Sequence, residues 1–516
     1  MAAKSELCGE PLKDYEQSIF ACMENGLLKS PDQLAVVSRS QPADHLSDMV
    51  QCSTGKPPSR ISDSCLRWTY AEYFGTAVNL AAGLSPQVPT SNSIMVTFIP
   101  NSVEWLLLLS SSIMAKFGVA FLDIDMLQKP RQAELETRLL QLRPFSIVVA
   151  DGVGASAIDD ALQRPKLVNS LVNPLKISLA TPVRLTNGKR DDWKHFATLC
   201  ESRDASILAK VIDGARYDDP NRTAMVIYTS GTSGGMPKGC VRDVAGVAAY
   251  TKQQRFASID HTQRTVRLIH TANFRAIAPV ITLISWRDGA TVVLSTYPFQ
   301  PRTYLDDVDQ ENVTELVLIP AQLYAVAEEP TLRSRRYDSL KLVTVGGDIL
   351  TSEVFRLCKR TFPQAKVQNV HGMTEAGAMF DWPYSGDVDS VPFHHGISPV
   401  GHIAPATKIR ILSSTGEIVA RGEVGDLHVQ SRTTFQRYLR QQTDTPEIYT
   451  DETGRWFKTG DVAMVNNAGD IYIVGRSKDV IKRAGVSIAP STIESCLQAY
   501  IGSQVSRRLR LCDFED

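Results

Sequence analysis

The sequence lacks a long apolar run, paired cysteine motifs and a surplus of charge of either sign. Its most apolar stretch, Trp105–Met114, is soon interrupted by Lys116, so it is too short to span a bilayer and predicts a buried helix instead. The nine cysteines are odd in number and none are in C-x-x-C spacing, which argues against a disulfide framework or a zinc ribbon. A net charge of −1 gives no general attraction to nucleic acid or to acidic membranes.

Targeting signals are equally scarce. The first residues, Met1-Ala-Ala-Lys-Ser-Glu, show no basic segment followed by an apolar one. The last three, Phe514-Glu515-Asp516, do not form a peroxisomal Ser-Lys-Leu address. These features lead us to expect a cytoplasmic protein with no membrane span and no nucleic-acid partner.

What the sequence does contain is an alternation of strands and helices. Short apolar segments predict strands at 94–99, 146–149, 224–228, 291–294, 316–319 and 342–345. Helical spacing of apolar residues lies between several of them, which indicates an α/β fold with ligands at the carboxyl ends of the strands. Residues 41–64 are rich in polar residues and predict an exposed loop. From Gly425 onward, closely spaced short strands predict a β-rich lobe.

The most informative segment follows the strand expected at 224–228. Residues 228–239 read Y-T-S-G-T-S-G-G-M-P-K-G, with four Ser or Thr hydroxyls, four glycines and one lysine. Glycines allow a tight turn that presents backbone N–H groups, hydroxyls add donors, and Lys238 adds a mobile positive charge. The segment therefore predicts a cradle for a polyphosphate.

The alternatives to a phosphate cradle are a Walker A loop, a nucleophile elbow and a plain glycine-rich surface loop. A Walker A loop ends in Gly-Lys-Ser/Thr, whereas here Pro237 precedes Lys238 and Gly239 follows it, so that interpretation fails. The five residues 231–235 match G-x-S-x-G, the nucleophile elbow of α/β-hydrolases. That pattern is permissive, so the hydrolase and the plain loop stay as alternatives.

The loop resembles the signature of the AMP-forming adenylate superfamily, which contains acyl-CoA synthetases, luciferases, acyl-AMP ligases and adenylation domains. That family usually reads T-S-G-T-T-G-x-P-K-G. Here Ser233 stands at the second Thr, and one extra residue lies between Gly234 and Pro237. Further motifs follow in the family's order, at 346–348 (G-G-D), 369–375 (N-V-H-G-M-T-E), 457–461 (F-K-T-G-D) and 475–490. The resemblance covers about residues 66–499 and implies a large N-terminal domain of α/β sheets with a β-rich lobe.

The resemblance also implies roles for individual residues. Lys238, Thr374, Glu375 and His270 would be catalytic, and Glu375 would hold Mg²⁺ beside the phosphates of ATP. The nucleotide would be bound by Thr229, Ser230, Gly231, Thr232, Ser233, Gly234, Lys238, Gly347, Asp348, Asn369, His371, Gly372, Thr374, Asp461, Arg476 and Lys482. Asp461 would grip the ribose hydroxyls. His371 stands where the family has a tyrosine that stacks on adenine, and an imidazole can still stack there.

The acid substrate would lie between the phosphate loop and the turn at Thr374-Glu375. The resemblance assigns this pocket to Phe274, Arg275, Gly346 and Gly372. His270 is either a residue near the carboxylate or a structural histidine. Members that activate amino acids carry an Asp beside the aromatic residue. Arg275 stands there instead and would repel an ammonium group, which favours a fatty, aryl or polyketide-type acid.

The C-terminal part departs from the family pattern. Lys478 stands at the position of the family's domain hinge, which divides the chain into residues 1–477 and a remnant of a C-terminal domain at 478–516. The family's later P-K-T-x-x-G-K-type motif, whose lysine bridges the carboxylate and the α-phosphate, has no match. From this departure we expect slow adenylation and impaired thiol transfer.

Together these motifs predict activation of a carboxylic acid by ATP to acyl-AMP, followed by transfer to the thiol of coenzyme A. One alternative is an acyl-AMP ligase that loads phosphopantetheine on a carrier protein of a polyketide or peptide synthase in secondary metabolism. The alternative of another class is a nucleotide-binding protein with impaired catalysis.

Overall fold

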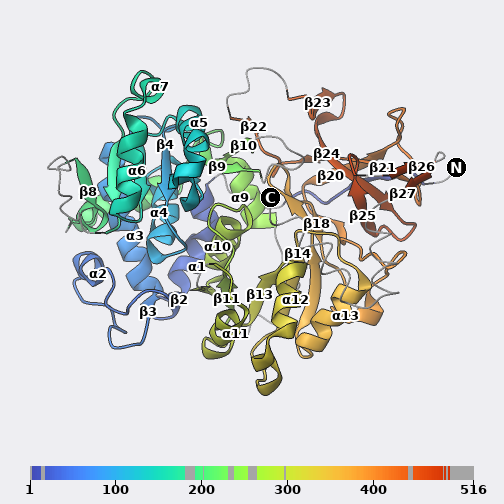
Figure 1. Ribbon diagram of the computed structural model, residues 1–516, viewed down its shortest axis with the longest axis horizontal. Helices are drawn as coiled ribbons and strands as arrows, with labels where there is room; N and C mark the ends of the chain where they lie inside the picture. Colours follow the sequence, from blue (N-terminus) through green and yellow to red (C-terminus); the bar gives the residue numbers. More distant parts are fainter. Residues whose placement is uncertain are drawn as a thin grey trace.

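A computed structural model describes residues 3–12, 18–180, 192–201, 203–229, 237–253, 264–295, 298–439 and 445–479, and the backbone of two later strands. The predicted combination of α/β sheets with a β-rich lobe is confirmed, with two larger mixed sheets and a six-stranded antiparallel one. Figure 1 shows most of the first half of the chain on one side of the molecule, and the β-rich lobe with the N-terminus on the other. None of the described helices is long and apolar enough to cross a membrane.

The first sheet has eight strands, and the strand after which the glycine-rich loop begins lies near one edge. In spatial order it contains β22 (Arg437–Tyr438), β10 (Gly239–Asp243), β9 (Thr223–Tyr228), β5 (Gly118–Phe121), β4 (Ile94–Phe98), β6 (Ser146–Val149), β7 (Leu175–Ser178) and β8 (Trp193–His195). From β9 to β8 the neighbours are parallel, whereas β10 runs antiparallel to β9 and β22 antiparallel to β10. The strands predicted at 94–99, 146–149 and 224–228 are all present.

The second sheet has seven strands and places its carboxyl edge toward the predicted nucleotide motifs. Its order is β15 (Lys366–Val370), β14 (Leu342–Gly346), β13 (Glu315–Leu318), β11 (Val266–Ile269), β12 (Thr291–Leu294), β2 (Leu34–Ser38) and β3 (Leu66–Thr69). All neighbours are parallel except β2 and β3. Ligands of such sheets bind beyond the carboxyl ends of the strands, where His270, Gly347 and His371 lie.

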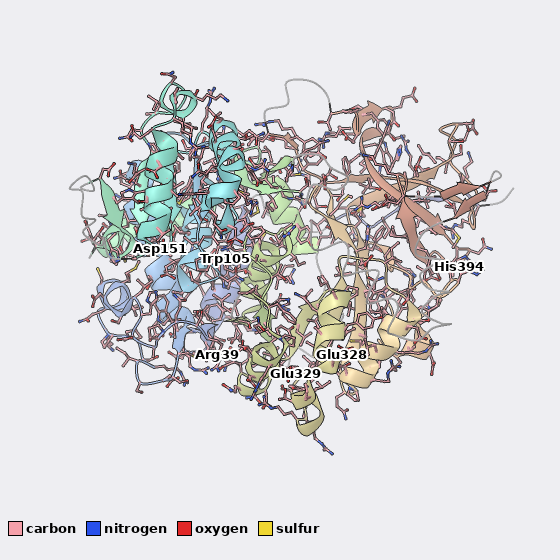
Figure 2. All side chains as sticks on the ribbon, in the orientation of Figure 1. Arg39, Trp105, Asp151, Glu328, Glu329 and His394 are labelled. Atoms are coloured by element: carbon pink, nitrogen blue, oxygen red, sulfur yellow. The ribbon has the colours of Figure 1, made fainter. Side chains whose placement is uncertain are left out.

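Helices lie between these two sheets and also pack on their outer faces. The helices are α1 (Ile19–Lys29), α2 (Ser47–Thr54), α3 (Tyr70–Leu84), α4 (Val103–Met114), α5 (Gln132–Leu142), α6 (Gly152–Leu162), α7 (Pro165–Val168), α8 (Ala205–Ala215), α9 (Val244–Gln253), α10 (Ile277–Asp288), α11 (Pro301–Gln310), α12 (Pro320–Glu328) and α13 (Ser352–Thr361). Residues of α1, α3, α4 and α10 share one hydrophobic core with strands of both sheets. Trp105 of α4 lies within it, fully buried, as the sequence predicted (Figure 2).

The β-rich lobe begins earlier than the sequence predicted. Its sheet contains β1 (Glu6–Cys8), β20 (Thr407–Leu412), β21 (Val424–Ser431), β24 (Gly454–Val465), β23 (Ile448–Asp451) and β25 (Ile471–Arg476). It therefore starts before Gly425 and recruits a strand from the N-terminal end, with Leu7 opposite Ile409. Short-range patterning carries no sign of a pairing across 400 residues, because register depends on the partner strand.

The prediction that residues 41–64 form one exposed loop is wrong in its middle. Helix α2 crosses this segment and buries Met49 and Val50. Polar residues dominate the composition, but this apolar pair is enough to dock a short helix on α3. The boundary proposed at residue 478 stays a prediction, because beyond residue 479 the structure describes only the backbone of β26 (Ile481–Arg483) and β27 (Val486–Ile488).

Candidate active site

The two ends of the glycine-rich loop are held by a β-hairpin. Tyr228 of β9 pairs with Gly239 of β10. Beyond this pair, Thr229 N donates to the Lys238 carbonyl at 3.0 Å, and Lys238 N donates to Thr229 Oγ1 at 3.0 Å. Ser230, Gly231, Thr232, Ser233 and Gly234 lie outside the described residues. A strand follows Lys238 where a nucleophile elbow needs a helix, so the hydrolase interpretation is wrong.

Arg138 of α5 supports this hairpin from behind. Its side chain is 1% exposed, its guanidinium lies 4.1 Å from the centre of the Tyr228 ring, and it donates to the Pro237 carbonyl at 3.0 Å. Glu134 balances its charge at 3.0 Å. A buried contact therefore fixes the position of Pro237, just before Lys238, although Lys238 itself is exposed.

Thr374 and Glu375 lie in the turn of a small hairpin that follows β15. Strand β16 (Gly372–Met373) pairs with β17 (Gly377–Ala378), so the predicted magnesium ligand stands at the tip. Gly377 has φ +75°, and a Cβ there would meet the Tyr250 ring at 2.7 Å. Only glycine fits that position without strain, and the turn is thereby pinned against α9.

A buried arginine that the sequence analysis did not identify holds this turn in place. Arg242 of β10 donates to the carbonyl oxygens of Thr374 at 2.9 Å and Thr433 at 2.7 Å. A longer contact of 3.4 Å reaches the Glu375 carbonyl. Arg242 is 5% exposed, and burial lowers the pKa of its guanidinium. A guanidinium bound to carbonyl oxygens locks their positions, because its donors are arranged in a rigid planar fork.

Lys238 and Glu375, both predicted to neutralise phosphates, are connected through Tyr438 of β22. The Tyr438 hydroxyl donates to Glu375 Oε1 at 3.1 Å, and Lys238 Nζ lies 4.7 Å from the centre of the Tyr438 ring. Burial, together with the neighbouring carboxylate of Glu375, raises the pKa of Tyr438, so the phenol stays a hydrogen-bond donor. Lys238 Nζ also contacts Glu447 Oε1 at 3.2 Å.

The predicted ribose ligand Asp461 is the centre of a second cluster. It is 1% exposed and pairs across β24 and β25 with Arg476. Arg476 Nε contacts Asp461 Oδ1 at 3.0 Å, and His371 Nε2 lies 3.1 Å from Oδ2. Because a carboxylate only accepts, His371 Nε2 carries the proton. The three residues that the sequence placed around the nucleoside are thus brought together.

The remaining predicted nucleotide residues lie at the same edge of the seven-stranded sheet. Gly346 ends β14, and a Cβ there would meet the Val370 carbonyl at 2.4 Å, so the adjacent strands approach at their ends. Gly347 has φ +85° and, like Asp348 and Gly372, is exposed. Asn369 is buried and donates to the Pro399 carbonyl at 3.0 Å, which ties β15 to the segment entering the β-rich lobe.

His270 lies at the end of β11 but turns into the protein interior. It is 4% exposed, Nε2 lies 3.0 Å from Gln322 Oε1, and its ring packs edge-on against Tyr304 at 4.9 Å. Burial lowers its pKa to about 4, so it is neutral near pH 7. Phe274 is half-buried against the core, while Arg275 is exposed and lies 5.4 Å from the Phe274 ring.

Two predicted lysines follow β25, the hinge residue Lys478 and the nucleotide ligand Lys482. Lys478 is exposed just after β25. Lys482 belongs to β26, and its side chain lies outside the described residues. Within the part of the chain that the structure describes, no three His, Cys, Asp or Glu side chains gather as a metal site. Glu375 therefore stands as a single carboxylate, which suits a cation held mainly by substrate oxygens and water.

The chain is similar to known enzymes along most of its length. A family model described as "AMP-binding enzyme" matches residues 51–439. An acyl–CoA ligase of Pestalotiopsis microspora is 33% identical over 98% of this chain and 86% of its own length. An indoleacetate–CoA ligase of Aromatoleum aromaticum is 27% identical over 86% of this chain and 80% of its own length.

Solved structures show the same fold at low identity. The luciferase-like enzyme of the mealworm Zophobas morio superposes with a TM-score of 0.72 at 18% identity, covering 92% of this chain and 100% of that chain. ATP-bound MatB of Rhodopseudomonas palustris superposes with a TM-score of 0.67 at 20% identity, covering 93% and 83%. The protein belongs to the AMP-binding enzyme family, within the adenylate-forming superfamily.

Proposed function

We propose that the protein is an AMP-forming acid–thiol ligase that activates a carboxylic acid with ATP and passes the acyl group to coenzyme A. The sequence support is the similarity to an acyl–CoA ligase along nearly the whole chain. The structural support is the pair of clusters described above. His371 of one cluster and Glu375 of the other belong to one short segment, residues 371–375, which connects the two clusters.

The observation that carries this proposal is the carboxylate of Asp461 beside His371. In the proposed complex the ribose hydroxyls donate to the Asp461 carboxylate, which has acceptor sites left after Arg476 and His371 are bound. Adenine lies against the imidazole face of His371. The triphosphate then extends past Thr374 toward Glu375 and Lys238, where the glycine-rich loop enters the sheet.

The chemistry has two steps. A carboxylate oxygen attacks the α-phosphorus of ATP, the bond to the bridging oxygen breaks, and pyrophosphate leaves with that electron pair. The thiol then loses its proton and attacks the acyl carbon, and AMP leaves. Such phosphoryl transfer depends on positioning and charge neutralisation. Lys238 supplies a positive charge, and Glu375 would hold Mg²⁺, which offsets the charge of the leaving phosphates.

We further propose that the acid is aryl or fatty, and not an α-amino acid. Arg275 is exposed beside Phe274, so a substrate ammonium group in this region would meet a positive charge. His270 adds no charge, because its pKa is about 4. The names of two relatives, a 4-coumarate–CoA ligase of Oryza sativa and the indoleacetate–CoA ligase, refer to aryl acids.

The acceptor and the rate are the finer parts of the proposal. Coenzyme A is favoured by the similarity to an acyl–CoA ligase, and phosphopantetheine on a carrier protein is the alternative. For the rate, a nucleotide-binding protein with impaired catalysis is the alternative of another class.

Acid-dependent exchange of labelled pyrophosphate into ATP tests the proposal. We expect exchange with aryl or fatty acids and none with α-amino acids, followed by formation of an acyl thioester when coenzyme A is added. Thioester on a carrier protein but not on coenzyme A would select the alternative acceptor. Nucleotide binding without exchange across the acid panel would contradict ligase activity.

A further inference from the structure

The seven-stranded sheet has an open pocket at the edge opposite the candidate active site. Its volume is about 440 Å³, and it is lined by residues at the amino ends of the strands. Leu34, Val266 and Thr291 begin β2, β11 and β12, while Thr314 and Lys341 directly precede β13 and β14. The nucleotide motifs lie at the carboxyl ends of the strands of this sheet, so the two sites are separated by the length of the strands.

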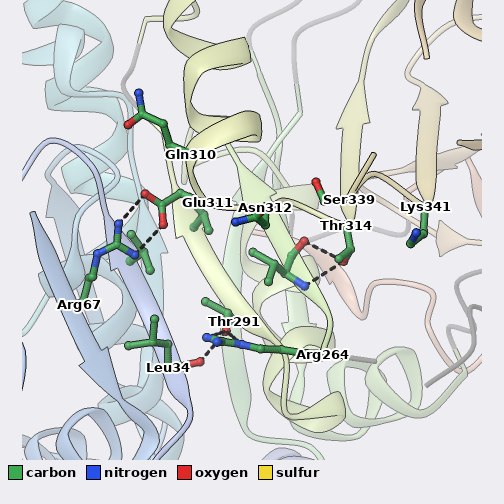
Figure 3. A pocket seen from close by; sticks show the side chains of 13 residues that line it. Leu34, Arg67, Arg264, Thr291, Gln310, Glu311, Asn312, Thr314, Ser339 and Lys341 are labelled. Atoms are coloured by element: carbon green, nitrogen blue, oxygen red, sulfur yellow. Dashed lines mark hydrogen bonds and ion pairs between the residues drawn. The ribbon is translucent and has the colours of Figure 1, made fainter. Parts of the chain in front are cut away.

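The charges around this pocket are unbalanced. Three cationic side chains line it, Arg67, Arg264 and Lys341, against the single carboxylate of Glu311. That carboxylate is already shared, because Arg67 binds both oxygens at 2.6 and 2.7 Å and Arg39 contacts Oε1 at 3.1 Å. Figure 3 shows the Arg67–Glu311 pair on one side of the pocket and Lys341 on the other.

Arg264 is held by neutral groups. Its Nε and NH2 groups donate to Thr291 Oγ1 at 3.2 and 2.8 Å, and Thr291 in turn donates to the Leu34 carbonyl (Figure 3). No carboxylate among the described residues forms an ion pair with it. Partial burial and the nearby charges of Arg60 and Arg67 lower the pKa of its guanidinium. An incoming anion would relieve this repulsion.

The rest of the lining is apolar or neutral. Leu34, Val37, Val266 and Val293 supply apolar surface between the charged groups. Gln310 and Asn312 add neutral hydrogen-bonding groups at the rim. Pockets of a few hundred Å³ that combine an apolar lining with a few convergent polar groups are typical of small-molecule sites.

We propose that this amino-edge pocket binds a small organic anion, a carboxylate or phosphate carrying a short apolar body, with Arg264 and Lys341 as its charge-binding residues. The anionic group lies against Arg264 and Lys341, and the apolar body covers the valines. The site is independent of the proposed ligase activity, because none of its residues contacts the nucleotide motifs.

Isothermal titration of the full chain with hexyl phosphate, hexanoate and inorganic phosphate tests this site, with AMP at saturation to fill the nucleotide site. Hexanoate bound in the acid pocket of the proposed ligase is distinguished because that binding persists in variants of the amino-edge pocket. We expect one equivalent of hexyl phosphate or hexanoate to bind at least about tenfold more tightly than inorganic phosphate, because only they cover the apolar lining. Preference for hexyl phosphate identifies a phosphate ligand, and preference for hexanoate a carboxylate.

Arg264→Gln and Lys341→Met should each weaken this binding about tenfold, the effect of losing one charge-assisted hydrogen bond. Both side chains are exposed, so both variants should remain folded, and the thermal unfolding temperature should fall only in Arg264→Gln, which loses the hydrogen bonds to Thr291 Oγ1. Lys366→Met is the matched control, since Lys366 is an exposed lysine that begins the neighbouring strand β15 but does not line the pocket. The proposal would be overturned if Arg264→Gln and Lys341→Met bound the probes as tightly as Lys366→Met and the native protein do. Tighter binding of inorganic phosphate than of hexyl phosphate and hexanoate, or no binding of any probe, would also overturn it.

Discussion

The two ends of the candidate nucleotide site are built differently. At the nucleoside end, Asp461 is 1% exposed and held from two sides by Arg476 and His371. At the phosphate end, the Lys238 and Glu447 side chains are 44% and 36% exposed and form a single ion pair. Buried, hydrogen-bonded groups keep their geometry, whereas exposed ion pairs contribute about 0–1 kcal/mol and rearrange readily.

Because of this contrast, we expect the two ends to contribute to different properties of the enzyme. The nucleoside end is arranged before a nucleotide arrives, so it should contribute mainly to binding affinity. The phosphate end contains the charges that neutralise the leaving pyrophosphate, so it should contribute mainly to rate. Single substitutions at each end test this division.

The largest effect is expected at Lys238. In Lys238→Met the positive charge is lost while the alkyl stem remains, and the rate of acid-dependent pyrophosphate exchange should fall about 10²–10³-fold, the range for one electrostatic contact to a transition state. The unfolding temperature should not change, because the lysine is exposed. Glu447→Gln is the control, since it removes the partner of Lys238 without removing the lysine. A rate for Lys238→Met within about twofold of the native enzyme's would place the phosphates elsewhere.

The second effect is expected at Arg242, a buried side chain that holds the turn of the phosphate end in place. Arg242→Met leaves the carbonyl oxygens of Thr374, Glu375 and Thr433 without this donor. At about 1 kcal/mol for each lost hydrogen bond, the free energy of unfolding should fall by about 3 kcal/mol in urea titrations.

Arg242→Lys keeps a cation that reaches fewer of these carbonyls, so its stability should lie between those of the native protein and Arg242→Met. Exchange activity per folded molecule should fall in both variants, because Glu375 loses its fixed position. Native stability in Arg242→Met would show that the turn is held by other contacts.

The smallest effect is expected at His371. His371→Ala removes both the aromatic face and the hydrogen bond to Asp461, and the dissociation constant of AMP should rise about fivefold to tenfold. His371→Phe restores an aromatic face without the donor and should recover part of this loss. AMP binding unaffected by alanine would remove His371 from the nucleotide site. Measurement by calorimetry also reports whether the phenylalanine variant exceeds the native affinity.

Much of this arrangement could be predicted from the sequence. Short apolar strands and the glycine-rich segment gave the α/β class and the position of Lys238, since both depend on local residue types. The ordered motifs brought His371, Asp461 and Arg476 to one place, and the structure confirms that these three side chains are in contact. Their roles in nucleotide binding stay predictions.

The parts that could not be predicted depend on contacts between distant segments. The role of Arg242 could not be predicted from the residues around it, because its partners Thr374 and Thr433 are 132 and 191 residues away. Tyr438 gave no local signal either, and β1 joins the lobe through a strand 400 residues later. For His270 the sequence allows either a substrate contact or a structural histidine, and its burial and hydrogen bond to Gln322 favour the structural role.

The most direct test of one nucleotide bridging both ends compares two ligands in two variants. Affinities of AMP and of the non-hydrolysable ATP analogue α,β-methylene ATP are measured by calorimetry for Lys238→Met and Asp461→Asn. We expect Asp461→Asn to weaken both ligands by the same factor, about tenfold or more, because both contain the ribose. Lys238→Met should weaken only the triphosphate analogue. Equal losses for AMP and the analogue in Lys238→Met, or unchanged AMP binding in Asp461→Asn, would contradict a nucleotide that runs from Asp461 to Lys238.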